Sequence, residues 1–288
     1  MKRLIALLLA TLALLAGCAT LDEQQRTWIF QPSDRSWAGG TQAAESMEDV
    51  WIDFTSEVTA KPVKLHGLWA QNENFTTHAN APVLLYLHGA RFNVTGSAFR
   101  AQRMQELGFS VLAIDYRGFG KSTNELPSEA KAYEDARAAW EWLGEKYPGR
   151  PRYIFGHSLG GAIAIELAAQ VKDEAGTVVE GTFTSIPDVV STFKWGWLPV
   201  SLLITQRFEA VKRVPDIGAP LLVVHGGEDR LIQPELGRKL FEAAIVRKAF
   251  VLVEGGSHHN TNSVGQAQYR TALAALFGLD DSLRVVKR

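Results

Sequence analysis

Residues 152–171 read RYIFGHSLGGAIAIELAAQV, and this stretch decides the fold. The apolar run 153–155 predicts a short buried strand, and the Ala-rich run 159–171 predicts a helix. Between them, Gly156-His157-Ser158-Leu159-Gly160 has the pattern GxSxG, in which small residues on both sides of a serine permit a strained strand-to-helix turn. Such a turn exposes the serine hydroxyl above the sheet, at the positive N-terminus of the helix. Ser158 is therefore the candidate nucleophile.

The segments around this turn alternate between strand and helix patterns. Further strands are expected at 51–58, 63–69, 83–87, 110–114, 178–183, 221–224 and 249–253. Further helices are expected at 97–107, 128–147 (with Ser128 as N-cap), 235–246 and 264–277. This alternation predicts an α/β domain with a mostly parallel central sheet and helices on both faces.

Two later loops carry residues that a serine nucleophile needs, a base and an acid that orients the base. On a sheet of this kind the acid and then the histidine follow the serine, each after a later strand. Residues 225–229 read HGGED, so either Glu228 or Asp229 follows the strand 221–224. Residues 255–259 read GGSHH, so either His258 or His259 follows the strand 249–253.

These motifs resemble the α/β-hydrolase fold from about residue 50 to the C-terminus. The likeness is greatest to compact serine hydrolases with a small lid or none, which include monoacylglycerol-lipase-like and serine-aminopeptidase-like members. It rests on the GxSxG turn, the acid and histidine loops, the His88-Gly89 turn, and the string DYRGFGKS at 115–122. The resemblance implies that 115–122 is a structural loop near the site.

The resemblance also assigns roles to single residues. The family pattern HGxxDxxxP selects Asp229 as the acid, although the proline of this chain, Pro234, lies one residue later than the pattern places it. The pattern Gly-x-His favours His258 as the base, although the adjacent His259 leaves that assignment open. The turn after the strand 83–87 implies that the Ala90 amide, together with that of Leu159, forms the oxyanion hole.

The stretch from Pro187 to Pro215 interrupts the alternation and contains Trp195, Trp197, Leu198 and Pro199. It is either a crossover helix with an aromatic packing face or a small lid or acyl-pocket wall beside the site.

The composition narrows the class of protein further. The chain has 288 residues, a formal net charge of -1 and one cysteine. A near-neutral chain lacks the basic surface that nucleic-acid binding requires, so no nucleic-acid partner is expected. A single cysteine excludes intramolecular disulfides and cysteine-based zinc sites. Neither a metal nor an organic cofactor is expected.

The N-terminus has the pattern of a bacterial lipoprotein. Lys2 and Arg3 precede an apolar run at 4–16, too short to span a bilayer but typical of a signal peptide. Leu15-Ala16-Gly17-Cys18 resembles the lipobox, so we expect a signal peptide at 1–17, lipidation of Cys18, a tether at 18–24 and the hydrolase domain at 25–288. Ala19 after the cysteine implies an outer-membrane anchor facing the periplasm.

The resemblance implies a serine hydrolase that cleaves a carboxylic ester or related acyl bond of a small molecule or lipid through an acyl-enzyme. A peptidase or acyltransferase of the same fold is an alternative. So is a catalytically inactive, lipid-anchored binding or scaffold protein, because a fold does not fix a function.

Overall fold

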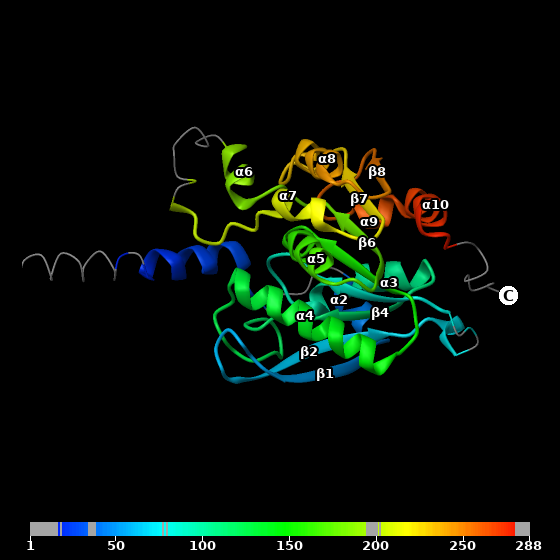
Figure 1. Ribbon diagram of the computed structural model, residues 1–288, viewed down its shortest axis with the longest axis horizontal. Helices are drawn as coiled ribbons and strands as arrows, with labels where there is room; N and C mark the ends of the chain where they lie inside the picture. Colours follow the sequence, from blue (N-terminus) through cyan, green and yellow to red (C-terminus); the bar gives the residue numbers. More distant parts are fainter. Residues whose placement is uncertain are drawn as a thin grey trace, which may run out of the picture.

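The structure is a computed structural model that describes residues 17, 19–33, 39–76, 78, 80–193, 201 and 203–279. Its centre is an eight-stranded sheet with the order β1-β2-β4-β3-β5-β6-β7-β8 (Figure 1). The strands are β1 (Glu48–Thr55), β2 (Pro62–Ala70), β3 (Val83–Leu87), β4 (Ser110–Ile114), β5 (Arg152–His157), β6 (Glu174–Glu180), β7 (Leu221–Gly226) and β8 (Lys248–Val253). The β1–β2 and β2–β4 pairs are antiparallel, and the other pairs are parallel. This arrangement confirms the α/β-hydrolase fold.

Helices cover both faces of the sheet, as predicted. They are α2 (Gly40–Ala44), α3 (Val94–Glu106), α4 (Glu129–Lys146), α5 (Leu159–Gln170), α6 (Ile186–Ser191), α7 (Ala210–Arg213), α8 (Pro234–Ala243), α9 (Thr261–Val264) and α10 (Gln266–Phe277). One core contains residues of α4, α5 and α8, and a second contains residues of α2, α3 and α10. In β3, Leu85 belongs to the first core and Tyr86 to the second. Both faces of a central parallel strand are therefore buried, which explains its continuous apolar sequence.

Several element boundaries differ from the prediction. β1 begins and ends three residues before the expected 51–58, and β6 begins four residues before 178–183. The helix expected at 97–107 is α3, which begins at Val94. The Asn93 side chain accepts a hydrogen bond from the Gly96 amide and so caps the helix three residues earlier than expected. The predicted final helix 264–277 is α10, which begins at Gln266, and the short helix α9 before it was not predicted. Gly265 separates the two helices, and a Cβ atom there would lie 2.7 Å from a methyl carbon of Val253. Ser128 caps α4 as predicted.

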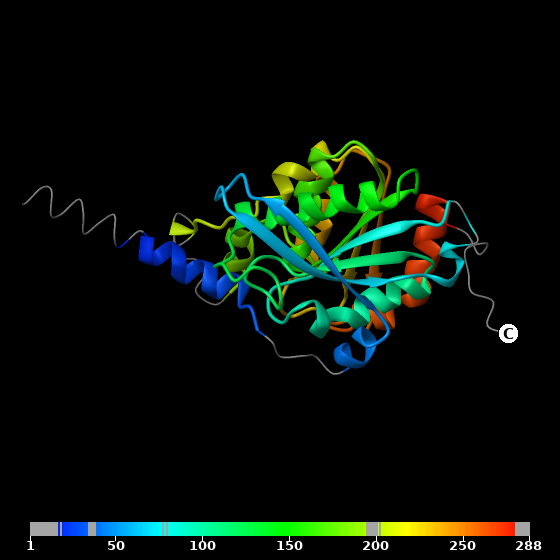
Figure 2. The same ribbon diagram turned by 90° about the horizontal axis from the view of Figure 1, so that it is seen from below.

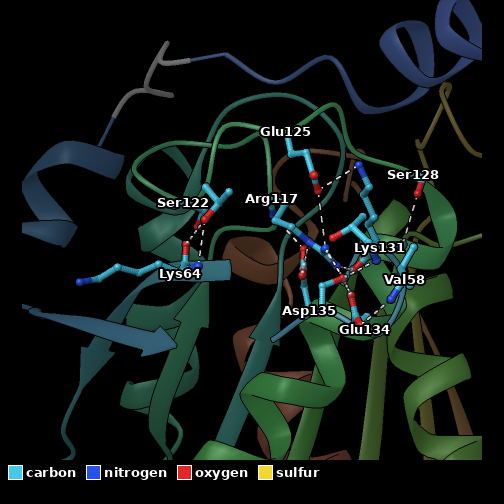
Figure 3. Close-up of polar contacts among 12 residues, drawn as sticks. Val58, Lys64, Arg117, Ser122, Glu125, Ser128, Lys131, Glu134 and Asp135 are labelled. Atoms are coloured by element: carbon cyan, nitrogen blue, oxygen red, sulfur yellow. Dashed lines mark hydrogen bonds and ion pairs between the residues drawn. The ribbon is translucent and has the colours of Figure 1, made fainter. Parts of the chain in front are cut away.

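The loop 115–122 is held by a buried arginine (Figure 3). Arg117 is fully buried, and its Nε and backbone amide both donate to the Asp135 carboxylate of α4, each at 2.8 Å. Its guanidinium also forms an ion pair with Glu134, and the Ser56 hydroxyl donates a hydrogen bond to the Glu134 carboxylate at 2.7 Å. The buried positive charge of Arg117 is therefore paired with carboxylates of α4. These contacts hold the loop that follows β4 against α4 and against the turn after β1.

Residues 19–30 form a helix, here called the N-terminal helix, and its first part, 19–24, falls in the expected tether 18–24. Asp22 accepts hydrogen bonds from Thr205 and Gln206, and Arg26 donates to the carbonyl oxygens of Leu126 and Pro127. The N-terminal helix therefore lies against the chain that follows α6, as Figures 1 and 2 show in blue and yellow-green.

The end of this helix enters the domain. Phe30 is fully buried, with its ring 5.8 Å from that of Phe208 and 6.4 Å from that of Phe119, whereas Trp28 stays largely exposed. Cys18 and the expected signal peptide, apart from Gly17, lie outside the described residues. Among the helices described, none is both long enough and apolar enough to cross a bilayer.

Candidate active site

The turn between β5 and α5 places Ser158 in a strained backbone conformation. Ser158 has φ 55° and ψ −121°, a positive φ that L-residues seldom adopt, and it precedes the first residue of α5. The turn is possible because of the flanking glycines. A Cβ on Gly156 would lie 2.2 Å from the Gly160 carbonyl oxygen, and a Cβ on Gly160 would lie 2.0 Å from that of Leu87. The GxSxG pattern is therefore a steric requirement of this turn.

A chain of hydrogen bonds joins the three residues that the sequence singled out. The Ser158 hydroxyl oxygen lies 3.0 Å from His258 Nε2, and His258 Nδ1 lies 2.7 Å from Asp229 Oδ2. Three loops, after β5, β7 and β8, contribute one residue each. Their strands are parallel, so the loops meet at the carboxyl edge of the sheet. With Nδ1 protonated toward Asp229, His258 Nε2 is free to accept the serine proton.

The carboxylate of Asp229 is buried and fully engaged. Oδ1 accepts hydrogen bonds from the amides of Leu231 and Ile232 at 3.0 and 2.9 Å. Burial would raise the pKa of Asp229, but hydrogen bonds with His225 and His258 and the charge of His258 outweigh it and hold the pKa below its ordinary value. Asp229 is therefore an anion at neutral pH and can stabilise a positive charge on His258.

A buried cluster behind the serine holds the backbone of the histidine loop. Arg100 Nη2, from α3, donates to the carbonyl oxygens of His258 at 3.3 Å and His259 at 3.1 Å. Arg100 Nε pairs with the buried Glu180 at 3.2 Å. His157 Nε2 lies 2.9 Å from the His258 carbonyl oxygen, and burial together with the Arg100 charge keeps its pKa well below the ordinary value. The histidine loop is thus fixed by its carbonyl groups, with the His258 ring toward Ser158 and His259 exposed.

The two residues whose amides the resemblance assigns to an oxyanion hole lie close to Ser158. Leu159 is the first residue of α5, and amides of a first helical turn have no acceptor within the helix. Ala90 follows β3 in a loop packed on the serine, because a Cβ on Gly89 would lie 3.0 Å from Ser158 Cβ. Both Leu159 and Ala90 line the same cavity as Ser158. His88 is buried, and its carbonyl oxygen accepts a hydrogen bond from the Tyr116 hydroxyl at 3.1 Å.

The serine and histidine open into a cavity of about 600 Å³ with mostly apolar walls. Two segments contribute much of the apolar lining, namely α6 with the chain around it and the N-terminal helix. The apolar lining residues from these two segments are Leu21, Trp28, Ile29, Ile186, Val189, Val190, Phe193, Leu203 and Ile204. Within the described part of 187–215, Val189, Val190, Phe193, Leu203 and Ile204 line the cavity, and the helical segments α6 and α7 are short. Trp195, Trp197, Leu198 and Pro199 lie outside the described residues.

Sequence reasoning missed two features of this site. Arg100 gave no signal, because a single arginine in a predicted helix is usually a solvated residue. The N-terminal helix did leave a signal, since Leu21, Gln25, Trp28 and Ile29 follow the spacing of one helical face and all line the cavity. Over the ranges that the structure describes, no group of three or more His, Cys, Asp or Glu side chains could hold a metal ion.

Comparisons with known proteins identify the family and agree with the fold. The family model described as "Serine aminopeptidase, S33" matches residues 78–209 and 187–263. An uncharacterized protein of Mycobacterium tuberculosis is 35% identical over 239 residues, covering 82% of this chain and 81% of that protein. The lysophosphatidylserine lipase ABHD12 of Danio rerio is 30% identical over 200 residues, covering 63% of this chain and 51% of the lipase. Among solved structures, an esterase of Pyrococcus furiosus has a TM-score of 0.65 at 20% identity, covering 86% of this chain and 96% of the esterase.

The fold and the serine at its elbow define the class of protein, which is a serine hydrolase of the α/β-hydrolase fold. Within this class, the chain belongs to the serine aminopeptidase S33 family.

Proposed function

We propose that this hydrolase cleaves a carboxylic ester through an acyl-enzyme, with Ser158 as nucleophile, His258 as general base and Asp229 as the acid that orients it. The observation that carries the proposal is the continuous hydrogen-bond chain from Asp229 Oδ2 through both His258 nitrogens to the Ser158 hydroxyl. These contacts fall within hydrogen-bonding reach, as general-base catalysis requires.

The reaction proceeds in two halves. Ser158 Oγ attacks the ester carbonyl carbon while its proton moves to His258 Nε2. Collapse of the tetrahedral intermediate breaks the bond to the alcohol oxygen, which leaves with the proton from His258. Water then gives a proton to His258 and attacks the acyl-enzyme. The carboxylic acid leaves, and the proton returns to Ser158. Asp229 stays ionised throughout and stabilises the imidazolium.

The Ala90 and Leu159 amides are proposed to bind the oxyanion of the tetrahedral intermediate. Both line the cavity beside Ser158. An amide at the start of α5 also carries the positive end of the helix dipole. Removing one such donor typically costs about 2.7–4 kcal/mol of transition-state stabilisation.

We propose a lipid-like ester with a long acyl chain as the substrate class. The cavity volume of about 600 Å³ is in the range of small-molecule sites. Its walls supply aliphatic and aromatic side chains from the N-terminal helix and α6, which suit an acyl chain better than a peptide. The lysophosphatidylserine lipase relative supports the same class.

The N-terminal sequence supports an envelope location for the enzyme. We propose that residues 1–17 are removed as a signal peptide and that Cys18 is lipidated, which anchors the hydrolase domain 25–288 to the outer membrane on its periplasmic side. The lipobox-like sequence Leu15-Ala16-Gly17-Cys18 carries this part of the proposal.

A fluorophosphonate probe tests the nucleophile directly. The wild type should be labelled, and Ser158→Ala should be neither labelled nor active while it keeps a wild-type circular dichroism spectrum, because only one hydroxyl is lost. A series of p-nitrophenyl esters from acetate to palmitate measures the chain-length preference, which should favour the longer chains. Esterase activity near wild type in Ser158→Ala would refute the mechanism.

A further inference from the structure

The mouth of the cavity is surrounded by exposed hydrophobic side chains. In the part of the chain that the structure describes, ten large hydrophobic side chains are exposed, and five of them line this one cavity. These five, here called the apolar rim, are Leu21 (36% exposed), Trp28 (63%), Phe193 (50%), Leu203 (60%) and Leu231 (44%). Scattered exposed hydrophobic residues need no explanation, whereas a group gathered around one opening marks an interaction surface.

The polar residues of the N-terminal helix explain why the rim stays exposed. Asp22, Gln25 and Arg26 form hydrogen bonds with the loops around 126–127 and 203–206, among them Gln25 Nε2 to the Leu203 carbonyl oxygen at 2.8 Å. These bonds fix the rotation of the helix. Leu21 and Trp28, two turns apart on one face, are thereby held at the cavity with much of their surface still in solvent.

The sequence before the N-terminal helix indicates what covers the rim. The apolar run 4–16 lies just before the N-terminal helix, and Leu21 follows Cys18 by three residues. Such a run is typical of a signal peptide, which is removed, so that the lipidated Cys18 becomes the first residue of the proposed mature protein. The helix that carries two rim residues then directly follows the lipid anchor, which holds it at the bilayer.

We propose that the apolar rim is a membrane-docking surface that contacts the bilayer and opens the cavity to it, so that an acyl chain passes from the lipid to Ser158. This inference rests on the proposed function for the identity of the substrate, but contact between rim and bilayer does not depend on catalysis. The rim side chains include Trp and Phe, which suit the interface between water and acyl chains.

The first test measures contact with the bilayer. The full-length protein, purified from membranes, is reconstituted into phosphatidylcholine vesicles with and without brominated acyl chains, which quench nearby tryptophan. Trp28→Phe should remove part of the quenching seen in the wild type, whereas Trp51→Phe should remove none. Trp51 is the matched control, since it is also exposed (41%) but does not line the cavity. Unchanged quenching in Trp28→Phe would overturn the proposal.

The second test compares p-nitrophenyl palmitate in vesicles with p-nitrophenyl butyrate in solution. The double variant Trp28→Gln/Leu203→Gln should lower the ratio of the palmitate rate to the butyrate rate at least tenfold. Trp51→Gln, at an exposed residue outside the cavity, should not change that ratio. A proportional loss of both rates would overturn docking. Trp28-dependent quenching in a protein inactive on both esters would support docking and refute the proposed function.

Discussion

Replacing Asp229 by asparagine tests the proposed mechanism most sharply, because the structure determines which way the new amide must point. Asp229 Oδ1 accepts two backbone amides, from Leu231 and Ile232. Turning the asparagine NH2 group toward these donors would leave buried groups unsatisfied, at about 1–3 kcal/mol each. The side-chain oxygen therefore keeps the amides, and the NH2 group faces His258 Nδ1, which lies 2.7 Å from Oδ2 in the wild type.

That orientation reverses the tautomer of the base. Nδ1 must then accept a hydrogen bond, so the proton moves to Nε2, which can no longer accept the proton of Ser158. We expect Asp229→Asn to lower kcat by about 10⁴-fold, which corresponds to about 5.4 kcal/mol at 1.36 kcal/mol per factor of ten. KM should change little, because Asp229 is not among the residues that line the cavity.

The assay is steady-state hydrolysis of a soluble p-nitrophenyl ester, with a circular dichroism spectrum to establish that the variant is folded. Glu228→Gln is the matched control, since Glu228 is the exposed neighbour and should retain wild-type kcat. A kcat for Asp229→Asn within tenfold of wild type would refute the tautomer argument and the role of Asp229.

Three further predictions concern the base, the anchor and a buried histidine. His258→Ala should lower turnover about 10³-fold or more, because the members of such a triad act as a unit, while His259→Ala should cost less than about tenfold; the reverse order in parallel ester assays would move the base by one residue. Cys18→Ser should release the protein from the membrane fraction and abolish incorporation of radiolabelled palmitate, and undiminished labelling would exclude lipidation at this residue. Burial lowers the pKa of His66, but its hydrogen bonds to two carboxylates, including Asp115, outweigh this and raise the pKa above 6.5. A raised pKa stabilises the fold below pH 6.5 and loses that contribution as the pH rises through the folded-state value. Urea titrations would measure the free energy of unfolding of the wild type and of His66→Gln at each pH. The difference between the two should become smaller from pH 6 to pH 9, and a constant difference would contradict a raised pKa of His66 in the folded state.

The sequence alone determined the fold and the region of the site, because both depend on local patterns. A buried strand, a glycine-flanked serine and an Ala-rich helix occur within 20 consecutive residues, and the steric demands of Gly156 and Gly160 concern neighbours in that same turn or in β3. Parallel strands bring their carboxyl ends to one edge of the sheet. The sequence therefore also predicted that the loops that carry Asp229 and His258 lie at the same edge as Ser158. Element boundaries were less accurate, since side-chain caps such as Asn93 decide them.

The tertiary structure decided which of two adjacent histidines faces the serine and what forms the cavity. The local pattern Gly-x-His favours His258 but leaves His259 open, and the loop that carries both is held by Arg100 and His157, which contact its carbonyl oxygens from positions more than 100 residues away in the chain. The same holds for the N-terminal helix. Its polar residues bind a loop about 180 residues further along the chain, and this contact turns a segment expected to be a tether into a wall of the cavity. The helical spacing of this segment is visible in the sequence, but its partners are not, because they become neighbours only when the sheet has assembled.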